Sequence, residues 1–233
     1  MKMTKTIGAV VLLGAAVAVS QVGAFASGSA VPSAPAGPSG PSAPNRSPEE
    51  MAIASYNSGI DHKDKGIKLE LAAAGVTDPK ERAKADDKVK KEYEKALKDF
   101  KSAASGSPQM YQAYNGMGFS YRKTGDYVKA LEMYDRALTL KPGFPDAIEY
   151  RGEAYLGLNR IEDAKNAYLE VLAADRKQAD TLMAAMQKWI EQKKSNPAGV
   201  DPAVVTGLEG WVSGRAEIAR ETAAMGLSHG PRW

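Results

Sequence analysis

The sequence predicts an all-α protein, an α-solenoid of antiparallel helix hairpins. Three observations lead to this fold class. Apolar residues recur every three or four positions in several segments between residues 47 and 225, which is helical spacing. Short clusters of Gly, Pro, Ser, Asn and Asp separate these segments. A pattern of small and aromatic residues also returns after 34 positions, the sign of stacked repeats.

Residues 1–26 have the three-part layout of a secretory signal peptide. Lys2 and Lys5 precede an uncharged run over residues 7–19, and Ala24-Phe25-Ala26 supplies small residues at the cleavage spacing. The run has 13 residues, fewer than the roughly 20 that cross a bilayer. We therefore expect cleavage after Ala26 and a periplasmic or secreted protein without membrane insertion. An uncleaved N-terminal anchor is the alternative.

Residues 27–46 consist almost entirely of Pro, Ser, Gly and Ala. Such a segment cannot bury enough apolar surface to offset the entropy of ordering, so we expect a disordered linker. The folded part should begin at residue 47.

Composition excludes several kinds of function. Without the signal, 29 basic residues face 28 acidic ones, a net charge of +1, which indicates neither nucleic acid nor anionic membrane as partner. There is no cysteine, and the two histidines, His62 and His229, are far apart. Asp61, His62 and Asp64 could touch a metal only opportunistically. We therefore expect no enzyme activity, no metal and no cofactor.

The clearest repeat covers residues 111–144. Its first half carries Tyr114, Met117, Gly118 and Tyr121, its turn Gly125, and its second half Ala130, Tyr134, Ala137 and Pro142. With these residues the segment resembles the tetratricopeptide-repeat (TPR) family. The export signal makes the whole chain similar to exported bacterial-type members of that family.

A second copy covers residues 145–178, with Ile148, Gly152, Tyr155, Ala164, Tyr168 and Val171 at matching places. Arg151 and Arg176 depart from the pattern there. A first copy covers residues 47–110, where Ala96, Phe100, Ala103 and Pro108 match the second half. Its first half returns only at Tyr56–Gly59, so we expect both helices to be longer by about 12 residues. That lengthening would make an arm of roughly 18 Å.

Caps and periodicity place the helices. Ser47-Pro48 should start a helix ending near residue 74, and Asp78-Pro79 a second ending near residue 104. Further helices are expected over about 108–124, 127–140, 144–157, 161–174 and 177–194. The last helix follows Asp201-Pro202, so that 179–225 forms a capping region and 226–233 a loose tail.

The first two helices differ in the clarity of their apolar faces. In the second, the face comprises Ala85, Val89, Tyr93, Ala96, Phe100 and Ala103. In the first, a weaker face comprises Met51, Tyr56, Ile60, Ile67 and Leu71. Gly59 and Gly66 interrupt the first helix, and each should cost it roughly 1 kcal/mol.

The resemblance implies that the first helix of each repeat lines a concave groove in which partner segments lie. It points nine residues into this groove: Gln112, Asn115, Phe119, Arg122, Lys123, Asp146, Glu149, Tyr150 and Glu153. Because Glu149 and Glu153 would repel a C-terminal carboxylate, that ligand is excluded. An extended or helical segment with a basic and an apolar feature is expected instead.

The expected function is therefore that of a non-catalytic scaffold or adaptor of the cell envelope, which binds a protein or peptide partner. The alternative is a self-assembling structural protein that oligomerises through the long hairpin or the end caps. An enzyme acting on cell-wall glycans would need paired carboxylates in a cleft.

Overall fold

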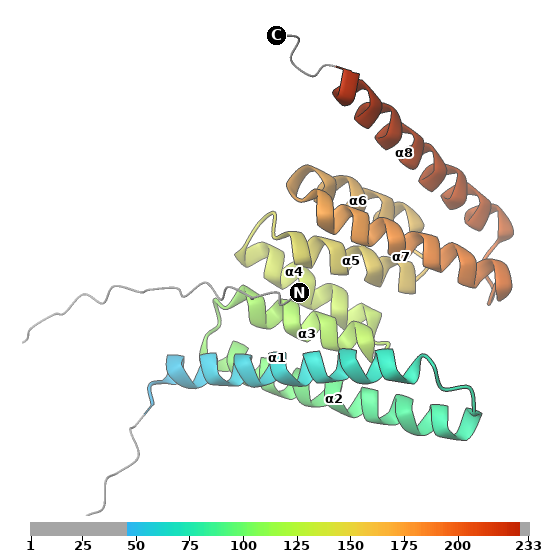
Figure 1. Ribbon diagram of the computed structural model, residues 1–233. Helices are drawn as coiled ribbons and strands as arrows, with labels where there is room; N and C mark the ends of the chain where they lie inside the picture. Colours follow the sequence, from blue (N-terminus) through green and yellow to red (C-terminus); the bar gives the residue numbers. More distant parts are fainter. Residues whose placement is uncertain (1–45, 229–233) are drawn as a thin grey trace, which may run out of the picture. The chain divides into compact units, whose positions relative to one another are not determined.

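The computed structural model describes residues 46–228, and within this range every regular element is an α-helix (Figure 1). In chain order the helices are α1 (Pro48–Ala73), α2 (Pro79–Gly106), α3 (Tyr111–Lys123), α4 (Tyr127–Leu140), α5 (Pro145–Gly157), α6 (Ile161–Ala174), α7 (Arg176–Ser195) and α8 (Pro202–Ser228). The predicted signal peptide, nearly all of the predicted linker and residues 229–233 lie outside the described residues.

The helices form successive antiparallel hairpins that stack on one another. Each helix packs against the next, and the first helices of the hairpins, α1, α3, α5 and α7, also contact one another in turn. These four helices therefore follow one another along one side of the stack (Figure 1). The predicted all-α solenoid of hairpins is confirmed.

The first hairpin is elongated, as the sequence predicts. Helices α1 and α2 have 26 and 28 residues, whereas α3 to α6 have 13 or 14. Both begin at the expected caps. The Ser47 side chain accepts a hydrogen bond from the Glu50 amide at 3.1 Å, and the Asp78 side chain accepts one from the Glu81 amide at 2.9 Å. These bonds satisfy amides that a helix start leaves without a partner.

The α1–α2 contact is made by small residues on α1. Its buried positions are Ala52, Gly59, Gly66 and Ala73, spaced by seven. A Cβ on Gly59 would lie 2.7 Å from the Phe100 ring, and one on Gly66 would lie 2.5 Å from the Tyr93 ring. The two glycines expected to weaken α1 are therefore the positions at which α2 comes closest.

The predicted apolar face of α1 is wrong in part. Met51, Ile67 and Leu71 are exposed, and only Tyr56 and Ile60 are half-buried against neighbouring helices. The Phe100 and Tyr93 rings of α2 pack directly against Gly59 and Gly66 of α1, where a larger side chain would clash. The larger apolar residues of α1 therefore lie on its other sides. On α2 the predicted face is confirmed at Tyr93, Ala96, Phe100 and Ala103, all of which are buried.

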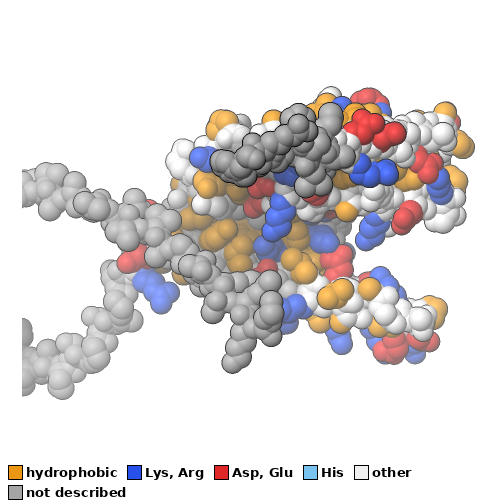
Figure 2. Space-filling model, turned by 45° about the horizontal axis from the view of Figure 1, so that its top comes forward, with side chains coloured by type: hydrophobic (Ala, Val, Ile, Leu, Met, Phe, Trp, Pro, Cys, Tyr) orange, Lys and Arg blue, Asp and Glu red, His pale blue; other side chains and the backbone are white. Residues whose placement is uncertain are grey.

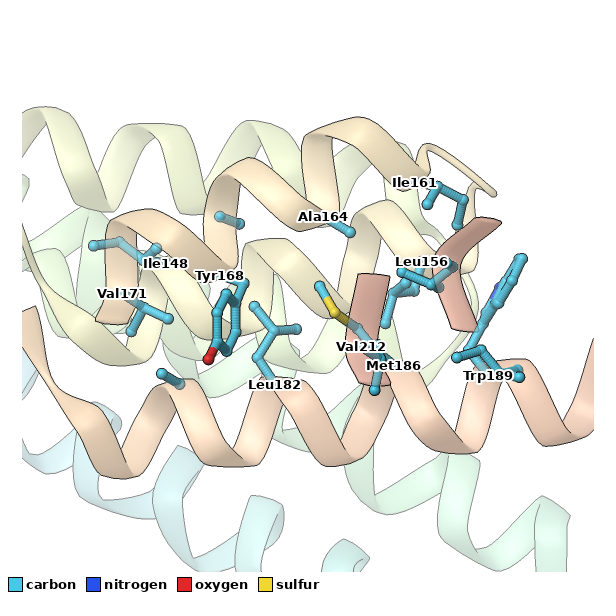
Figure 3. Close-up of a cluster of buried hydrophobic side chains, with 14 of the residues drawn as sticks. Ile148, Leu156, Ile161, Ala164, Tyr168, Val171, Leu182, Met186, Trp189 and Val212 are labelled. Atoms are coloured by element: carbon cyan, nitrogen blue, oxygen red, sulfur yellow. The ribbon is translucent and has the colours of Figure 1, made fainter. Parts of the chain in front are cut away.

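The largest core joins the last four helices (Figure 3). Ile148 of α5, Leu182 and Met186 of α7, and Leu208 of α8 are each inaccessible to solvent. Helix α8 covers the end of the stack through Val205, Leu208 and Val212. The helix runs to Ser228, three residues beyond the expected boundary at 225.

No helix within residues 46–228 combines the length and the apolarity that crossing a bilayer requires.

Candidate functional site: the concave face

The first helices bring eight of the nine predicted groove residues to two pockets. The smaller, of about 80 Å³, is lined by Tyr56, Ile60, Lys63, Gln112, Asn115, Gly116, Phe119, Phe144, Asp146 and Tyr150. The larger, of about 310 Å³, is lined by Glu70, Arg122, Lys123, Tyr127, Glu153, Leu156, Gly157, Ala185, Lys188, Trp189 and Gln192. Glu149 lines neither pocket.

Arg122 lies between the two pockets and is held from three sides. Its guanidinium carbon is 5.2 Å from the centre of the Phe119 ring and 5.1 Å from that of Tyr150. It also forms an ion pair with Glu153, and its side chain is only 8% exposed. Such cation–π contacts strengthen when water is excluded. Arg122 and Glu153 therefore neutralise each other within the chain.

Glu149 is buried and lacks an ion-pair partner. It is 1% exposed, and neither carboxylate oxygen has a hydrogen-bond partner among the described residues. Burial, together with the nearby Glu153 carboxylate, raises the pKa of Glu149 far above its ordinary value. The side chain is therefore uncharged at neutral pH. The predicted repulsion of a C-terminal carboxylate by Glu149 and Glu153 therefore loses its basis, because one carboxyl group is buried and the other is paired with Arg122.

Of the other predicted groove residues, Gln112, Lys123, Asp146 and Tyr150 are partly accessible, whereas Asn115 and Phe119 are buried. Lys123 lies 2.7 Å from Glu70 of α1, and Asp146 accepts a hydrogen bond from Gln178 of α7. Phe119 is 5% exposed, and it packs edge-on against Tyr93 and Tyr150. The face is therefore a preformed surface whose charged groups are mostly paired internally.

Sequence reasoning missed the contributions of α1 and α7. Tyr56, Ile60, Lys63 and Glu70 come from α1, where the lengthening displaces the repeat pattern. A second set, Lys188, Trp189 and Gln192, comes from α7, which carries no repeat motif. Helix order along the chain could have predicted both sets, because α1 and α7 are each the first helix of a hairpin.

His62 takes part in a network between α1 and α2. Its Nδ1 lies 2.7 Å from Oε2 of Glu92, and Lys65 and Lys95 each lie 3.0 Å from Oε1. Hydrogen bonds from His62 and the two lysines lower the pKa of Glu92 to about 2. In the described range, no group of three His, Cys, Asp or Glu residues is placed to hold a metal. This network connects the two helices.

Figure 2 shows one face of the molecule on which acidic and basic side chains are interspersed, with hydrophobic side chains in the hollow at its centre. Interspersed charge of both signs gives no long-range attraction for a polyanion.

Comparison with known proteins identifies the repeat. The tetratricopeptide-repeat pattern matches residues 111–144 and again residues 151–178. The chain therefore contains tetratricopeptide repeats. The Hsp70-Hsp90 organising protein of Plasmodium falciparum is 29% identical over 83 residues, which cover 36% of this chain and 33% of that protein.

Two further relatives match part of the chain. Protein ycf37 of Guillardia theta, uncharacterised, is 30% identical over 91 residues, covering 37% of this chain and 51% of that protein. Human protein O-mannosyl-transferase TMTC3 is 37% identical over 70 residues, covering 30% of this chain and 8% of that protein. The chain thus spans between about a tenth and a half of the length of the three relatives described.

Among solved structures, the first TPR domain of human RPAP3 is 17% identical, with a TM-score of 0.42 over 60% of this chain and 97% of that domain. The second TPR domain of the same protein, in complex with an HSP70 peptide, is 20% identical, with a TM-score of 0.39 over 56% of this chain and 95% of that domain.

Proposed function

We propose that the protein is a non-catalytic adaptor that binds a segment of a partner protein along the concave face of its TPR stack. The observation that carries this proposal is the construction of that face. Four first helices present aromatic and charged side chains around two adjoining pockets, and internal ion pairs hold these side chains in place. A preorganised surface of this kind lowers the entropy cost of binding an extended or helical segment.

The relatives support a binding role in a limited way. One is named as an organiser of two other proteins, Hsp70 and Hsp90. A role of that kind depends on binding surfaces, which stacked helix hairpins supply. The transferase TMTC3 shares only 8% of its length with this chain, so its activity gives no ground for proposing an enzyme here.

The concave face also offers no set of groups for catalysis. Glu149 and Glu153 are the adjacent carboxyl groups there, but one is buried and the other is paired with Arg122. Glycoside hydrolysis needs two carboxyl groups that reach the substrate from both sides of the bond. The binding role therefore explains the face better than hydrolysis does.

A pull-down with matched variants tests the adaptor role. One variant replaces three accessible groove residues with alanine: Gln112, Lys188 and Gln192. The control replaces three exposed residues of the second helices: Lys98, Glu132 and Asn166. Proteins cross-linked to the mature chain in its native host should be recovered with the control and lost with the groove variant. Equal recovery with both variants would move the binding site away from the concave face.

We further propose that the protein is exported and acts in the cell envelope, as a periplasmic or secreted adaptor. The support is the layout of residues 1–26, with its basic start, its apolar run and Ala24-Phe25-Ala26. N-terminal sequencing of the native protein should begin at Ser27. A cytosolic protein that retains residues 1–26 would contradict export. A membrane-bound protein that retains them would show that this segment is an N-terminal anchor.

The second candidate function is self-assembly through the long hairpin. Leu71 on that hairpin is 79% exposed, and Leu69 and Val76 line an open pocket at its end. Light scattering on the mature chain distinguishes the candidates, because a monomer at micromolar concentration argues against assembly.

A further inference from the structure

Helix α1 carries a row of large apolar side chains on its accessible side. Ile53, Ile60 and Ile67 are spaced by seven residues, and Leu71 follows one turn later. Ile53 and Ile67 are 46% and 41% exposed, and Leu71 is the most exposed large apolar residue of the described chain. We refer to these four residues as the isoleucine ridge. Contiguous exposed apolar rows of this kind mark interaction sites more often than isolated exposed residues do.

Three of the four ridge residues are exposed, and only Ile60 is half-buried, against the cluster that contains Phe100. The side of α1 that faces α2 is formed by Ala52, Gly59 and Gly66, each one position before an isoleucine. One residue corresponds to about 100° around a helix, so the ridge points roughly a quarter turn away from α2. Ile60 lines the smaller pocket of the concave face. The ridge therefore extends the concave face along α1.

The dimensions of the ridge suit a helix. From Ile53 to Leu71 it spans 18 residue steps, which is about 27 Å or five turns. Apolar positions spaced by seven and four form a straight seam, and a second helix packs against such a seam with its own i, i+3, i+4 and i+7 residues. An extended strand would match this spacing poorly, because its side chains alternate every two residues.

The solvent side of the ridge carries two carboxylates, Asp61 and Asp64, and one ammonium group, Lys68. Asp61 and Asp64 lie beside Ile60 on the solvent side, and both residues are exposed. Asp61 has no ion pair within the described residues, and the ion pair of Asp64 is a long one, 3.7 Å from Lys63 Nζ. A partner helix lying on the ridge would bring its flanking side chains next to these two carboxylates. Lysine or arginine at those flanks would be complementary in charge.

We propose that the isoleucine ridge docks an amphipathic helix of a partner protein whose apolar face is flanked by Lys or Arg side chains that pair with Asp61 and Asp64. This inference rests on the adaptor role proposed above, and it names the class of partner. An anionic membrane is an alternative occupant, which the vesicle experiment below tests. A second copy of the chain, paired two-fold about the centre of the ridge, would gather four carboxylates and is disfavoured.

Two labelled peptides serve as probes. Both are 18-residue designed amphipathic helices with leucine along one face, and one carries lysine at the flanking positions where its twin carries glutamate. Fluorescence anisotropy measures their binding to the mature chain, residues 27–233. The lysine peptide should bind at least tenfold more tightly than the glutamate peptide.

Three double variants locate the site. Ile67→Glu with Leu71→Glu changes the ridge, and Asp61→Lys with Asp64→Lys changes its edge. Val128→Glu with Leu169→Glu is the control, because these residues are also exposed apolar positions, 59% and 41% accessible, on α4 and α6. The ridge variant should lose at least tenfold in affinity for the lysine peptide, and the edge variant should prefer the glutamate peptide. The control should bind like the native chain. Circular dichroism checks that each variant retains its helical content.

Several results would overturn the proposal. These are binding of neither peptide, equal binding of both, or an equal loss in the control. A native dimer that the ridge variant converts to monomer would assign the ridge to a second copy. Binding to anionic vesicles that the ridge variant abolishes would assign it to a membrane. Failure of the peptides while the alanine pull-down still succeeds would reject the ridge and leave the adaptor role standing.

Discussion

At the scale of single residues, Glu149 differs most from what its residue type suggests. Its place on the first helix of a repeat predicted an accessible carboxylate, whereas its side chain is 1% exposed. Position along a helix determines which face a residue occupies. The burial of a residue on that face also depends on side chains of neighbouring helices, and α3 packs against the α5 helix that carries Glu149.

The first prediction concerns the pH dependence caused by Glu149. In the unfolded chain its pKa is the ordinary 4.5, and in the folded protein it is raised. The folded state thus holds a proton that the unfolded state releases above pH 4.5, so stability falls as pH rises from there. Glu149→Gln should be more stable than the native chain by about 1–3 kcal/mol at pH 8 and equal to it near pH 4.

Urea unfolding at a series of pH values measures this difference. Glu132→Gln is the control, because Glu132 is an exposed glutamate on the neighbouring helix α4, and it should follow the native pH profile. A Glu149→Gln profile parallel to the native one would show that Glu149 is ionised in the folded protein.

At the scale of helices, the α1–α2 hairpin shows that glycine can be a packing residue. Gly66 faces the Tyr93 ring, which is 1% exposed and has no room to move aside. The close packing and the network around Glu92 hold α1 and α2 together. Ile60 of the isoleucine ridge lines the smaller pocket.

The second prediction compares two glycine-to-alanine changes in helices. Gly66→Ala should destabilise the protein by about 1–2 kcal/mol, because overpacking against Tyr93 exceeds the gain in helix propensity. Gly207→Ala in α8 should stabilise it by about 0.5–1 kcal/mol, because a Cβ there meets nothing within 4 Å. Thermal unfolding followed by circular dichroism measures both. Stabilisation by both changes would mean that α1 and α2 are farther apart than the structure shows.

At the scale of the whole molecule, the stack has unequal ends. The first hairpin presents a long face to solvent, whereas the last helix covers a core that joins four helices (Figure 3). In repeat proteins each hairpin is stabilised mainly by its neighbours. Loss of α8 should therefore weaken the C-terminal repeats first and leave the distant arm folded.

The third prediction tests this arrangement within α8. Leu208→Asp places a charge in a fully buried position and should cost about 3 kcal/mol or more, while Val204→Asp, at a position that is 39% exposed, should cost less than about 1 kcal/mol. Hydrogen exchange should show lost protection in α6 and α7 for Leu208→Asp, with α1 and α2 still protected. A uniform loss along the chain would mean that the stack unfolds as one cooperative unit.

By itself, the sequence determined the helices, their order and the repeat. Helix starts depend on local capping groups such as Ser47 and Asp78, and both begin helices as predicted. The 34-residue pattern reports which helices pair, because small residues such as Gly118 must face the Tyr134 ring across the hairpin. These features depend on neighbours that are close in the chain or one hairpin away, so the pattern of residue types records them.

Only the tertiary structure decided which face of α1 is buried and which groove residues remain accessible. Hydrophobicity alone predicted Ile67 and Leu71 in the core, but both are exposed. The Tyr93 ring of α2 packs against Gly66 instead, where a side chain on α1 would clash. The residue types of Arg122 and Glu149 do not show their surroundings. Arg122 of α3 forms an ion pair with Glu153 of α5, and Glu149 is buried. Exposure and charge depend on contacts between distant segments, and residue types along a single helix do not record those contacts.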